Sequence, residues 1–243
     1  MLDIFLKNKR VIIVGPSESL LIHSTKEFIH SFDIIVRIND SVNTTLIHEQ
    51  KIGNRCDILY HCLNEDMGYG GIINVELLKK INTQYIFYPP TCDMKECDQL
   101  KISNLKKFLK LQQININDWN LLSKKINTKP NLGFFAIFDL LMYDIKELFI
   151  TGFTFSLDGY LPGYKDPKLD GTYIKWNFDR YKKSIPEANL ESVRHIRQNM
   201  FLYLKEYIIK NKDTRIKCDV ILERILKLNK LELKPDILKN IFY

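Results

Sequence analysis

The chain has 243 residues, of which 45% are hydrophobic and 27% are charged. This is the balance of an ordinary globular protein, and it excludes a chain without a folded core. The length suits one α/β domain, so we expect a single domain over residues 1–243. No apolar run approaches the roughly 20 residues that cross a bilayer, which argues against a transmembrane protein.

The formal net charge of +7 favours an anionic partner, such as nucleic acid, anionic lipid or a phosphorylated or acidic small substrate. A lysine-rich composition can also reflect only the base composition of a gene, so the charge does not choose among these partners. No recognisable nucleic-acid module accompanies it, and aromatic residues are not interleaved with the basic ones along a strand. We therefore expect no nucleic-acid partner.

The five cysteines follow no paired CxxC pattern. An odd number of cysteines without a signal peptide predicts neither a zinc site nor a disulfide framework. The first residues hold an apolar patch that is too short for a signal peptide. We expect reduced thiols and a cytoplasmic protein, with peripheral contact to a membrane left open.

Short apolar runs rich in β-branched residues predict buried parallel strands. They lie at residues 10–15, 33–37, 56–60, 84–88 and 147–151. Helical patterns over residues 20–31 and 133–143 lie between strands. This alternation predicts a doubly wound, mostly parallel, Rossmann-like α/β sheet.

Two stretches fall outside the alternation. Residues 152–184 are rich in glycine, tyrosine and proline with little periodicity, which is typical of a long functional loop, and we expect an active-site lid there. Residues 205–243 have a basic, amphipathic helical pattern broken at Pro235. We expect this segment to pack on the domain. Contact with anionic lipid, or with a second subunit in a homo-oligomer, stays open.

In doubly wound sheets, ligands bind beyond the carboxyl ends of the strands. The loops expected there are 15–19, 39–40, 61–64 and 152–164. A strand, Gly15, a turn and a helix in succession present backbone amides that suit a phosphate. The sequence has neither GxGxxG nor GxxxxGK[ST], which disfavours a dinucleotide site and excludes a P-loop ATPase.

Several segments resemble the conserved motifs of one enzyme family. Val-Gly-Pro-Ser-Glu-Ser-Leu-Leu at 14–21 is followed by Asp-Ile-Ile-Val-Arg-Ile-Asn at 33–39. Pro-Asn-Leu-Gly-Phe-Phe-Ala-Ile at 130–137 is followed by a strand that ends in Gly-Phe at 152–153, and His195 comes after the long loop. In this order they resemble the long, short and very short motifs of the sialyltransferases. The resemblance covers about residues 9–204 and extends to bacterial lipooligosaccharide sialyltransferases.

The resemblance implies an inverting glycosyltransferase. Such an enzyme moves sialic acid, or a similar acidic sugar, from a CMP-sugar donor to a hydroxyl of an oligosaccharide or glycolipid acceptor. His195 would be the catalytic base, and histidine titrates in a suitable range for that role. The family implies a variant of the GT-A-like fold with no metal and no other cofactor. The sequence agrees in having no convincing Asp-x-Asp pair.

The same positions imply a set of donor-binding residues. The expected set is Gly15, Ser17, Ser19, Asn39, Asn64, Asn131, Gly133, Gly152, Phe153, Thr154, Tyr160, Tyr164 and Tyr173. We expect Arg37 to be structural and to pair with Asp40 or Asp57 rather than to contact a ligand.

Three positions depart from the family pattern. Leu132 stands where a polar residue is expected, Met200 replaces a glutamate five residues after the histidine, and Pro16 replaces an asparagine. Two alternatives therefore stay open: a catalytically inactive, glycan-binding homologue, and a transferase for another CMP-activated sugar such as Kdo.

Overall fold

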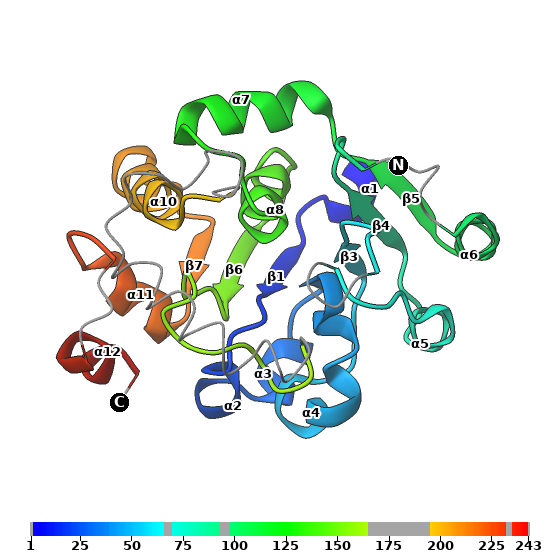
Figure 1. Cartoon of the computed structure of the whole chain (residues 1–243), viewed down its shortest axis with the longest axis horizontal. Coiled ribbons are helices and arrows are strands. Elements are labelled where there is room, and N and C mark those ends of the chain that lie inside the picture. The colour runs from blue at the N-terminus through cyan, green and yellow to red at the C-terminus, as the bar shows by residue number, and fades with distance from the viewer. Residues whose placement is uncertain (1, 66–69, 93–97, 165–194, 232–234, 243) are drawn as a thin grey trace, which may run out of the picture.

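In the computed structural model, the structure describes residues 2–65, 70–92, 98–164, 195–231 and 235–242. Its centre is a seven-stranded sheet in the order β5-β4-β3-β2-β1-β6-β7, in which every neighbouring pair is parallel (Figure 1). The strands are β1 (Arg10–Val14), β2 (Ile34–Ile38), β3 (Ile58–Tyr60), β4 (Tyr85–Tyr88), β5 (Lys110–Gln113), β6 (Glu147–Thr151) and β7 (Ile216–Cys218). The predicted doubly wound sheet is confirmed.

Helices cover both faces of the sheet, which explains why its central strands are apolar at nearly every position. One face packs against α1 (Leu2–Leu6), α7 (Ile116–Ile126), α8 (Leu132–Leu141) and α10 (Arg197–Asn211). The other face packs against α2 (Leu20–His23), α3 (Lys26–His30), α4 (Thr45–Ile52), α5 (Val75–Lys80) and α6 (Gln99–Lys106). In β1, Val11 and Ile13 belong to the first core and Ile12 and Val14 to the second.

The five predicted strands are present with ends shifted by at most two residues. The two edge strands were missed. β5 reads Lys-Leu-Gln-Gln and is mostly exposed, and β7 has only three residues. An edge strand that buries few side chains lacks the apolar pattern by which a strand is recognised.

Three helical predictions need correction. The helix predicted over 20–31 is two short helices, because Thr25 starts a new one by accepting a hydrogen bond from the amide of Phe28 at 3.2 Å. The C-terminal segment is not helical throughout: β7 interrupts it, and α11 (Val220–Leu226) follows. Pro235 begins α12 (Pro235–Phe242) instead of breaking a helix, since proline is favoured at the first helical position.

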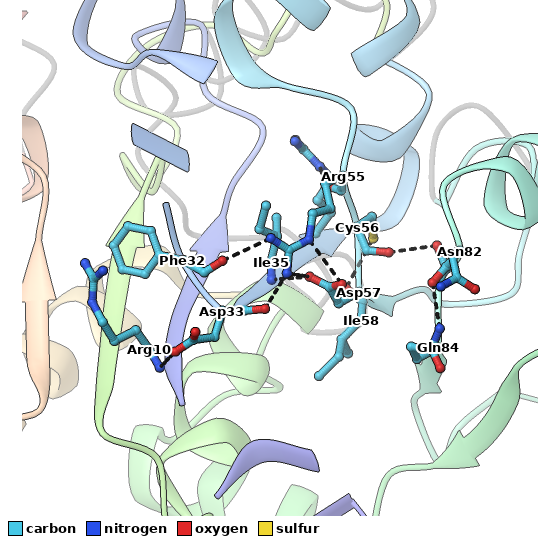
Figure 2. Close-up of polar contacts among 12 residues, drawn as sticks. Arg10, Phe32, Asp33, Ile35, Arg55, Cys56, Asp57, Ile58, Asn82 and Gln84 are labelled. Carbon is cyan, nitrogen blue, oxygen red and sulfur yellow. Dashed lines mark hydrogen bonds and ion pairs between the residues drawn. The ribbon is translucent and has the colours of Figure 1, made fainter. Parts of the chain in front are cut away.

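Polar contacts hold together the amino ends of the central strands (Figure 2). Arg55 forms an ion pair with Asp57 at 3.0 Å and donates to the carbonyl oxygen of Phe32 at 3.1 Å. Asp57 accepts a hydrogen bond from the amide of Ile35 at 2.7 Å, and Asp33 accepts one from the amide of Arg10 at 2.8 Å. These contacts fix the starts of β1, β2 and β3. The expected site lies at the opposite, carboxyl ends of the strands.

Arg37 is structural, as predicted, but its partners are not the expected carboxylates. The side chain is fully buried and donates to the carbonyl oxygens of Ile52, Gly53 and Arg55 at 2.6, 3.1 and 2.9 Å. The first two carbonyls close α4 and have no partner within that helix. Burial lowers the pKa of Arg37 to about 10, so the guanidinium stays charged at neutral pH.

Candidate active site

The carboxyl ends of β1 and β6 form the topological switch point of the sheet. The chain leaves β1 for α2 on one face and enters β6 from α8 on the other. Gly15 follows β1 and donates its amide to Thr151 at 2.8 Å. A Cβ at Gly15 would lie 2.2 Å from the carbonyl oxygen of Gly152, whose own φ is +69°. Only glycine fits at Gly15, and the left-handed backbone favours it at Gly152.

The ring of Phe153 lies against two of the predicted glycines. A Cβ would approach the ring to 2.9 Å at Gly15 and to 3.0 Å at Gly133. The absence of side chains at these positions lets the ring bring together the loop after β1, the loop after β6 and the first turn of α8. Phe153 is half-buried, and it also packs against the main hydrophobic core.

The start of α8 lies beside this ring. Asn131 caps the helix by accepting a hydrogen bond from the amide of Phe134 at 2.8 Å. The amides of Leu132 and Gly133 then stand in the first turn, where the helix dipole is positive. This end of α8 favours an anion. Asn131 itself is exposed, with its side-chain oxygen engaged by the cap.

His195 lies at the same end of α8. Its Nδ1 is 2.9 Å from the carbonyl oxygen of Lys129, and the next residue, Ile196, donates its amide to Thr128 at 3.1 Å. A carbonyl oxygen can only accept, so Nδ1 is the donor in this contact. His195 is exposed, and its imidazole lies next to the first turn of α8.

A half-buried carboxylate that the sequence did not reveal joins the loops after β1 and β6. Asp158 accepts hydrogen bonds from the hydroxyls of Ser17 and Thr154 and from the amide of Ser19, the last at 3.2 Å. Ser17 and Ser19 also bond to each other at 2.6 Å. Burial raises the pKa of Asp158. The sequence signal at Asp158-Gly159 is that of a turn, which does not distinguish such a residue.

These contacts occupy three of the predicted donor-binding residues. Ser17 is 3% exposed, and Ser19 and Thr154 are each 5% exposed, with hydroxyls engaged inside the protein. A donor that contacts them would first have to displace Asp158. Their role in donor binding stays a prediction.

The backbone joins the same loops. The amide of Glu18 donates to Gly159 at 3.0 Å, and the amide of Leu161 donates to Pro16 at 2.8 Å. Tyr164 is buried in the core with its ring centroid 5.0 Å from that of Tyr160. Tyr160 is half-buried and forms an isolated antiparallel bridge with Ser17. Tyr173 and the remainder of the predicted lid after residue 164 lie outside the described residues.

Asn39 connects the ends of β2 and β3. It adopts a φ of +49°, and its Oδ1 accepts a hydrogen bond from the amide of Cys62 at 3.0 Å. Asn64 follows β3 and is exposed. Its backbone carbonyl oxygen accepts a hydrogen bond from the amide of Gly70 at 3.0 Å. His61 is buried and its pKa is lowered to about 4, so it is neutral at pH 7 and does not supply charge.

The described members of the predicted set therefore lie at the carboxyl ends of the strands, in two groups. Asn39 and Asn64 follow β2 and β3. The other described residues lie around β1, β6 and the start of α8; they are Gly15, Ser17, Ser19, Asn131, Gly133, Gly152, Phe153, Thr154, Tyr160, Tyr164 and His195.

Two of the three departures from the sialyltransferase motifs, Leu132 and Met200, lie in the core. Leu132 is 7% exposed and Met200 is 0% exposed, and both belong to the main hydrophobic cluster. Their side chains therefore replace polar groups of the family with apolar packing instead of presenting new chemistry to the crevice.

Among the described residues, none of the helices has the length and hydropathy needed to cross a bilayer. In the same part of the chain, no group of three or more His, Cys, Asp or Glu side chains is placed to hold a metal ion.

No family model matches the sequence, and no curated protein is similar enough to count as a relative. The fold, however, is similar to solved sialyltransferases. A mammalian sialyltransferase superimposes with a TM-score of 0.52 at 11% identity, over 87% of this chain and 68% of that one. A mammalian sialyltransferase in complex with Gal-β-1-3GalNAc-ortho-nitrophenol gives 0.43 at 11% identity, over 71% and 66%.

The sialyltransferase CstII from Campylobacter jejuni, in complex with the substrate analogue CMP-3FNeuAc, gives a TM-score of 0.38 at 15% identity, over 79% of this chain and 87% of that one. The present chain spans about two thirds of the length of the mammalian enzymes. The chain has a sialyltransferase-like fold, as the sequence motifs predicted.

Proposed function

We propose that the protein is a glycosyltransferase of the sialyltransferase type. It would transfer sialic acid or a similar acidic sugar from a CMP-sugar to a hydroxyl of an oligosaccharide or glycolipid acceptor. The observation that carries the proposal is the position of His195, whose Nδ1 is bound to Lys129 beside the first turn of α8 in a sialyltransferase-like fold.

His195 would act as the general base. With its proton on Nδ1, the ring offers Nε2 to the acceptor hydroxyl as that oxygen attacks the anomeric carbon. The carbonyl of Lys129 would then stabilise the imidazolium that forms. A single displacement of this kind inverts the configuration at the anomeric carbon.

The start of α8 would hold the negative charge of the donor. The amides of Leu132 and Gly133, at the positive end of the helix dipole, suit the carboxylate of the sugar or the departing phosphate. The half-buried Phe153, which lies between Gly15 and Gly133, would contact the cytosine base. The net charge of +7 favours an anionic donor at longer range.

The proposal includes no metal ion. Leaving-group charge would be balanced by backbone amides and by hydroxyls such as that of Tyr160, and the sequence has no convincing Asp-x-Asp pair. The metal requirement can be measured directly, because activity in EDTA would be retained under this proposal.

The rival is a glycan-binding homologue without activity. The burial of Leu132 and Met200 favours it, since the family has polar residues at these positions. The two functions share a fold and differ at His195: catalysis needs the imidazole, whereas binding does not.

The test starts with calorimetric titration in EDTA of CMP, UMP and GMP into the wild type. Selective binding of CMP supports the donor class, and tighter binding of another nucleotide overturns it. Transfer from CMP-activated sialic acid and from CMP-activated Kdo to a panel of galactosides then identifies the sugar. His195→Ala should keep CMP affinity and lose transfer. CMP binding without transfer from either donor would support the inactive homologue.

A further inference from the structure

The helix that follows His195 begins without a side-chain cap. Ile196 is the N-cap residue of α10, and its hydrocarbon side chain cannot accept a hydrogen bond from the first amides of the helix. A residue outside the helix holds this end in place. The backbone amide of Ile196 donates to the hydroxyl oxygen of Thr128, 68 residues earlier in the chain, at 3.1 Å. Thr128 therefore fixes the residue next to His195.

A second contact runs in the opposite direction, from α10 to the end of α7. The last carbonyl oxygens of an α-helix have no partner within the helix. The side-chain amide of Asn199, in the first turn of α10, donates to the carbonyl oxygens of Ile126 and Asn127 at 2.9 and 3.4 Å. Thr128 and Asn199 thus form a reciprocal cap, in which each helix end gains a partner from beside the other.

The backbone that carries Thr128 and Lys129 is itself held in place. Asn127 ends α7 with a left-handed φ of +50°, and the amide of Thr128 donates to the carbonyl oxygen of Ser123 at 3.2 Å. Pro130 follows, and a residue before proline is restricted to extended backbone, which limits the directions of the Lys129 carbonyl. This segment therefore offers a hydroxyl and a carbonyl at fixed positions.

The same segment leads directly into α8. Asn131, the cap of α8, follows Pro130, so one short stretch of backbone fixes both the contact of His195 and the first-turn amides of α8. The helices α7, α8 and α10 pack on the same face of the sheet (Figure 1). Without the reciprocal cap, the start of α10 is able to move relative to α8 while all three helices stay folded. A displacement of about 1 Å at a reacting group can cost about 10²-fold in rate.

We propose that Thr128 and Asn199 are positioning residues for His195. By joining the end of α7 to the start of α10, they hold Nδ1 of His195 at the carbonyl oxygen of Lys129 and so orient the ring beside the start of α8. This role rests on the proposed function, in which His195 is the base. The two residues act through His195 and not through contact with the sugar, so their loss should reduce turnover without weakening donor binding.

The test removes one partner of each contact. Thr128→Val keeps the shape of the side chain and removes its acceptor, whereas Thr128→Ser keeps the hydroxyl. Asn199→Asp replaces the donor by an oxygen that faces two carbonyl oxygens. Urea titration establishes that each variant is folded under the assay conditions, and if Thr128→Val or Asn199→Asp does not fold, the other decides.

Two control variants remove the same kinds of contact elsewhere. Thr25→Val removes the hydroxyl that accepts from the amide of Phe28 at the start of α3. Asn211→Asp removes the donor to the carbonyl oxygen of Tyr207 at the far end of α10. Both controls lose a local hydrogen bond and leave the reciprocal cap intact.

Each variant of the full chain is compared with the wild type in kcat for transfer, in affinity for CMP, and in the nitrogen NMR shifts of the His195 ring. His195→Asn identifies the resonances of this ring among the five histidines. The spectra are recorded at about pH 8.5, where an ordinary histidine is neutral and carries its proton on one ring nitrogen. In the wild type, Nδ1 should give the shift of a protonated nitrogen.

In Thr128→Val and Asn199→Asp, kcat should fall about 10- to 100-fold while CMP affinity stays at the wild-type level. The ring nitrogens should move toward the shifts of a histidine that exchanges freely between its tautomers. Thr128→Ser and both controls should retain kcat and the wild-type shifts.

The proposal is overturned if the ring nitrogens are unchanged in both variants, or if they already show free exchange in the wild type. It is also overturned if kcat stays at the wild-type level in both variants or falls as far in the controls. The NMR measurement does not require catalysis. If the wild type transfers no sugar, the proposed function fails, whereas a ring held in the wild type and released in both variants still supports positioning by Thr128 and Asn199.

Discussion

The Nδ1 atom of His195 lies 2.9 Å from the carbonyl oxygen of Lys129. The two residues are far apart in the chain, and the contact fixes the ring at the start of α8, where the helix dipole favours an anion. This placement suits the proposed transfer, in which His195 would act as the base and the helix end would face the charge of the donor. This contact also gives the role of His195 a test that separates chemistry from structure.

His195→Asn should retain the contact and lose the reaction. The amide nitrogen of asparagine can replace Nδ1 as donor to Lys129, but nothing replaces Nε2 as base. We expect a change in unfolding free energy within about 0.5 kcal/mol, as for an exposed substitution, and a fall in kcat of about 10²- to 10⁴-fold. Denaturant titration and a transfer assay measure the two quantities. A variant with near wild-type kcat would show that His195 is not the base.

Asp139→Asn should change how stability depends on pH. Burial raises the pKa of Asp139 to about 6 from 3.8. Between these values the folded protein holds more protons at this group than the unfolded chain, so the contribution of Asp139 to stability falls as the pH rises through that window. Above it, the wild type bears the full cost of a buried carboxylate.

The asparagine variant should therefore be more stable than the wild type at pH 8, by about 1–3 kcal/mol, and close to it at pH 4. Urea unfolding of both proteins at the two pH values gives the difference directly. Asp98→Asn, on the exposed start of α6, controls for a general effect of removing a negative charge. A variant that loses stability at pH 8 would show that the carboxylate is needed as an ion.

The parts of the fold that the sequence predicted are those that bury apolar residues on both sides. β1 and β6 were found because their apolar runs are continuous, whereas the edge strand β5 shows one leucine among polar residues. The glycines of the expected set were predicted from their motifs, and the structure gives a physical reason for one of them, since close backbone approach excludes a side chain at Gly15.

Contacts between side chains that are far apart in the chain could not be predicted from the sequence. Asp158 lies 141 residues after Ser17, and no local pattern indicates that the two meet. Arg37 was correctly predicted to be structural, yet its partners are backbone carbonyl oxygens at the end of α4. Every residue has such a carbonyl, so the sequence does not indicate which ones a side chain contacts. Polar networks depend on the tertiary arrangement, whereas strands and tight turns depend largely on local composition.

Gly15→Ala should destabilise the protein strongly. The added Cβ would lie 2.2 Å from the carbonyl oxygen of Gly152. Both backbones are held in place, because the amide of Gly15 donates to Thr151 and that of Gly152 donates to Asp219. We expect a loss of about 2–4 kcal/mol in unfolding free energy, measured by denaturant titration. Gly159→Ala is the matched control, because its Cβ would meet only the flexible carboxylate of Glu18. Equal losses in the two variants would show that backbone approach at the switch point is not the cause.

Asp158 should hold the loops after β1 and β6 together. Asp158→Ala removes the carboxylate that accepts from two hydroxyls and one amide. The donors on Ser17, Ser19 and Thr154, which are buried residues, would lose this acceptor. We expect a loss of about 2–4 kcal/mol, since each unsatisfied buried donor is costly. Asp158→Asn should lose about 1 kcal/mol, because its oxygen can still accept from Ser17 and Ser19 while its amide donates to Thr154.

Limited proteolysis shows which part of the chain is destabilised in the Asp158 variants. If Asp158 joins the two loops, cleavage within residues 152–164 should become faster in the alanine variant at a temperature where the sheet is still folded. The asparagine variant should be cleaved at nearly the wild-type rate. Uniform cleavage over the chain would instead mean that Asp158 supports the whole domain, and wild-type resistance in the alanine variant would mean that the backbone contacts of Glu18 and Leu161 suffice.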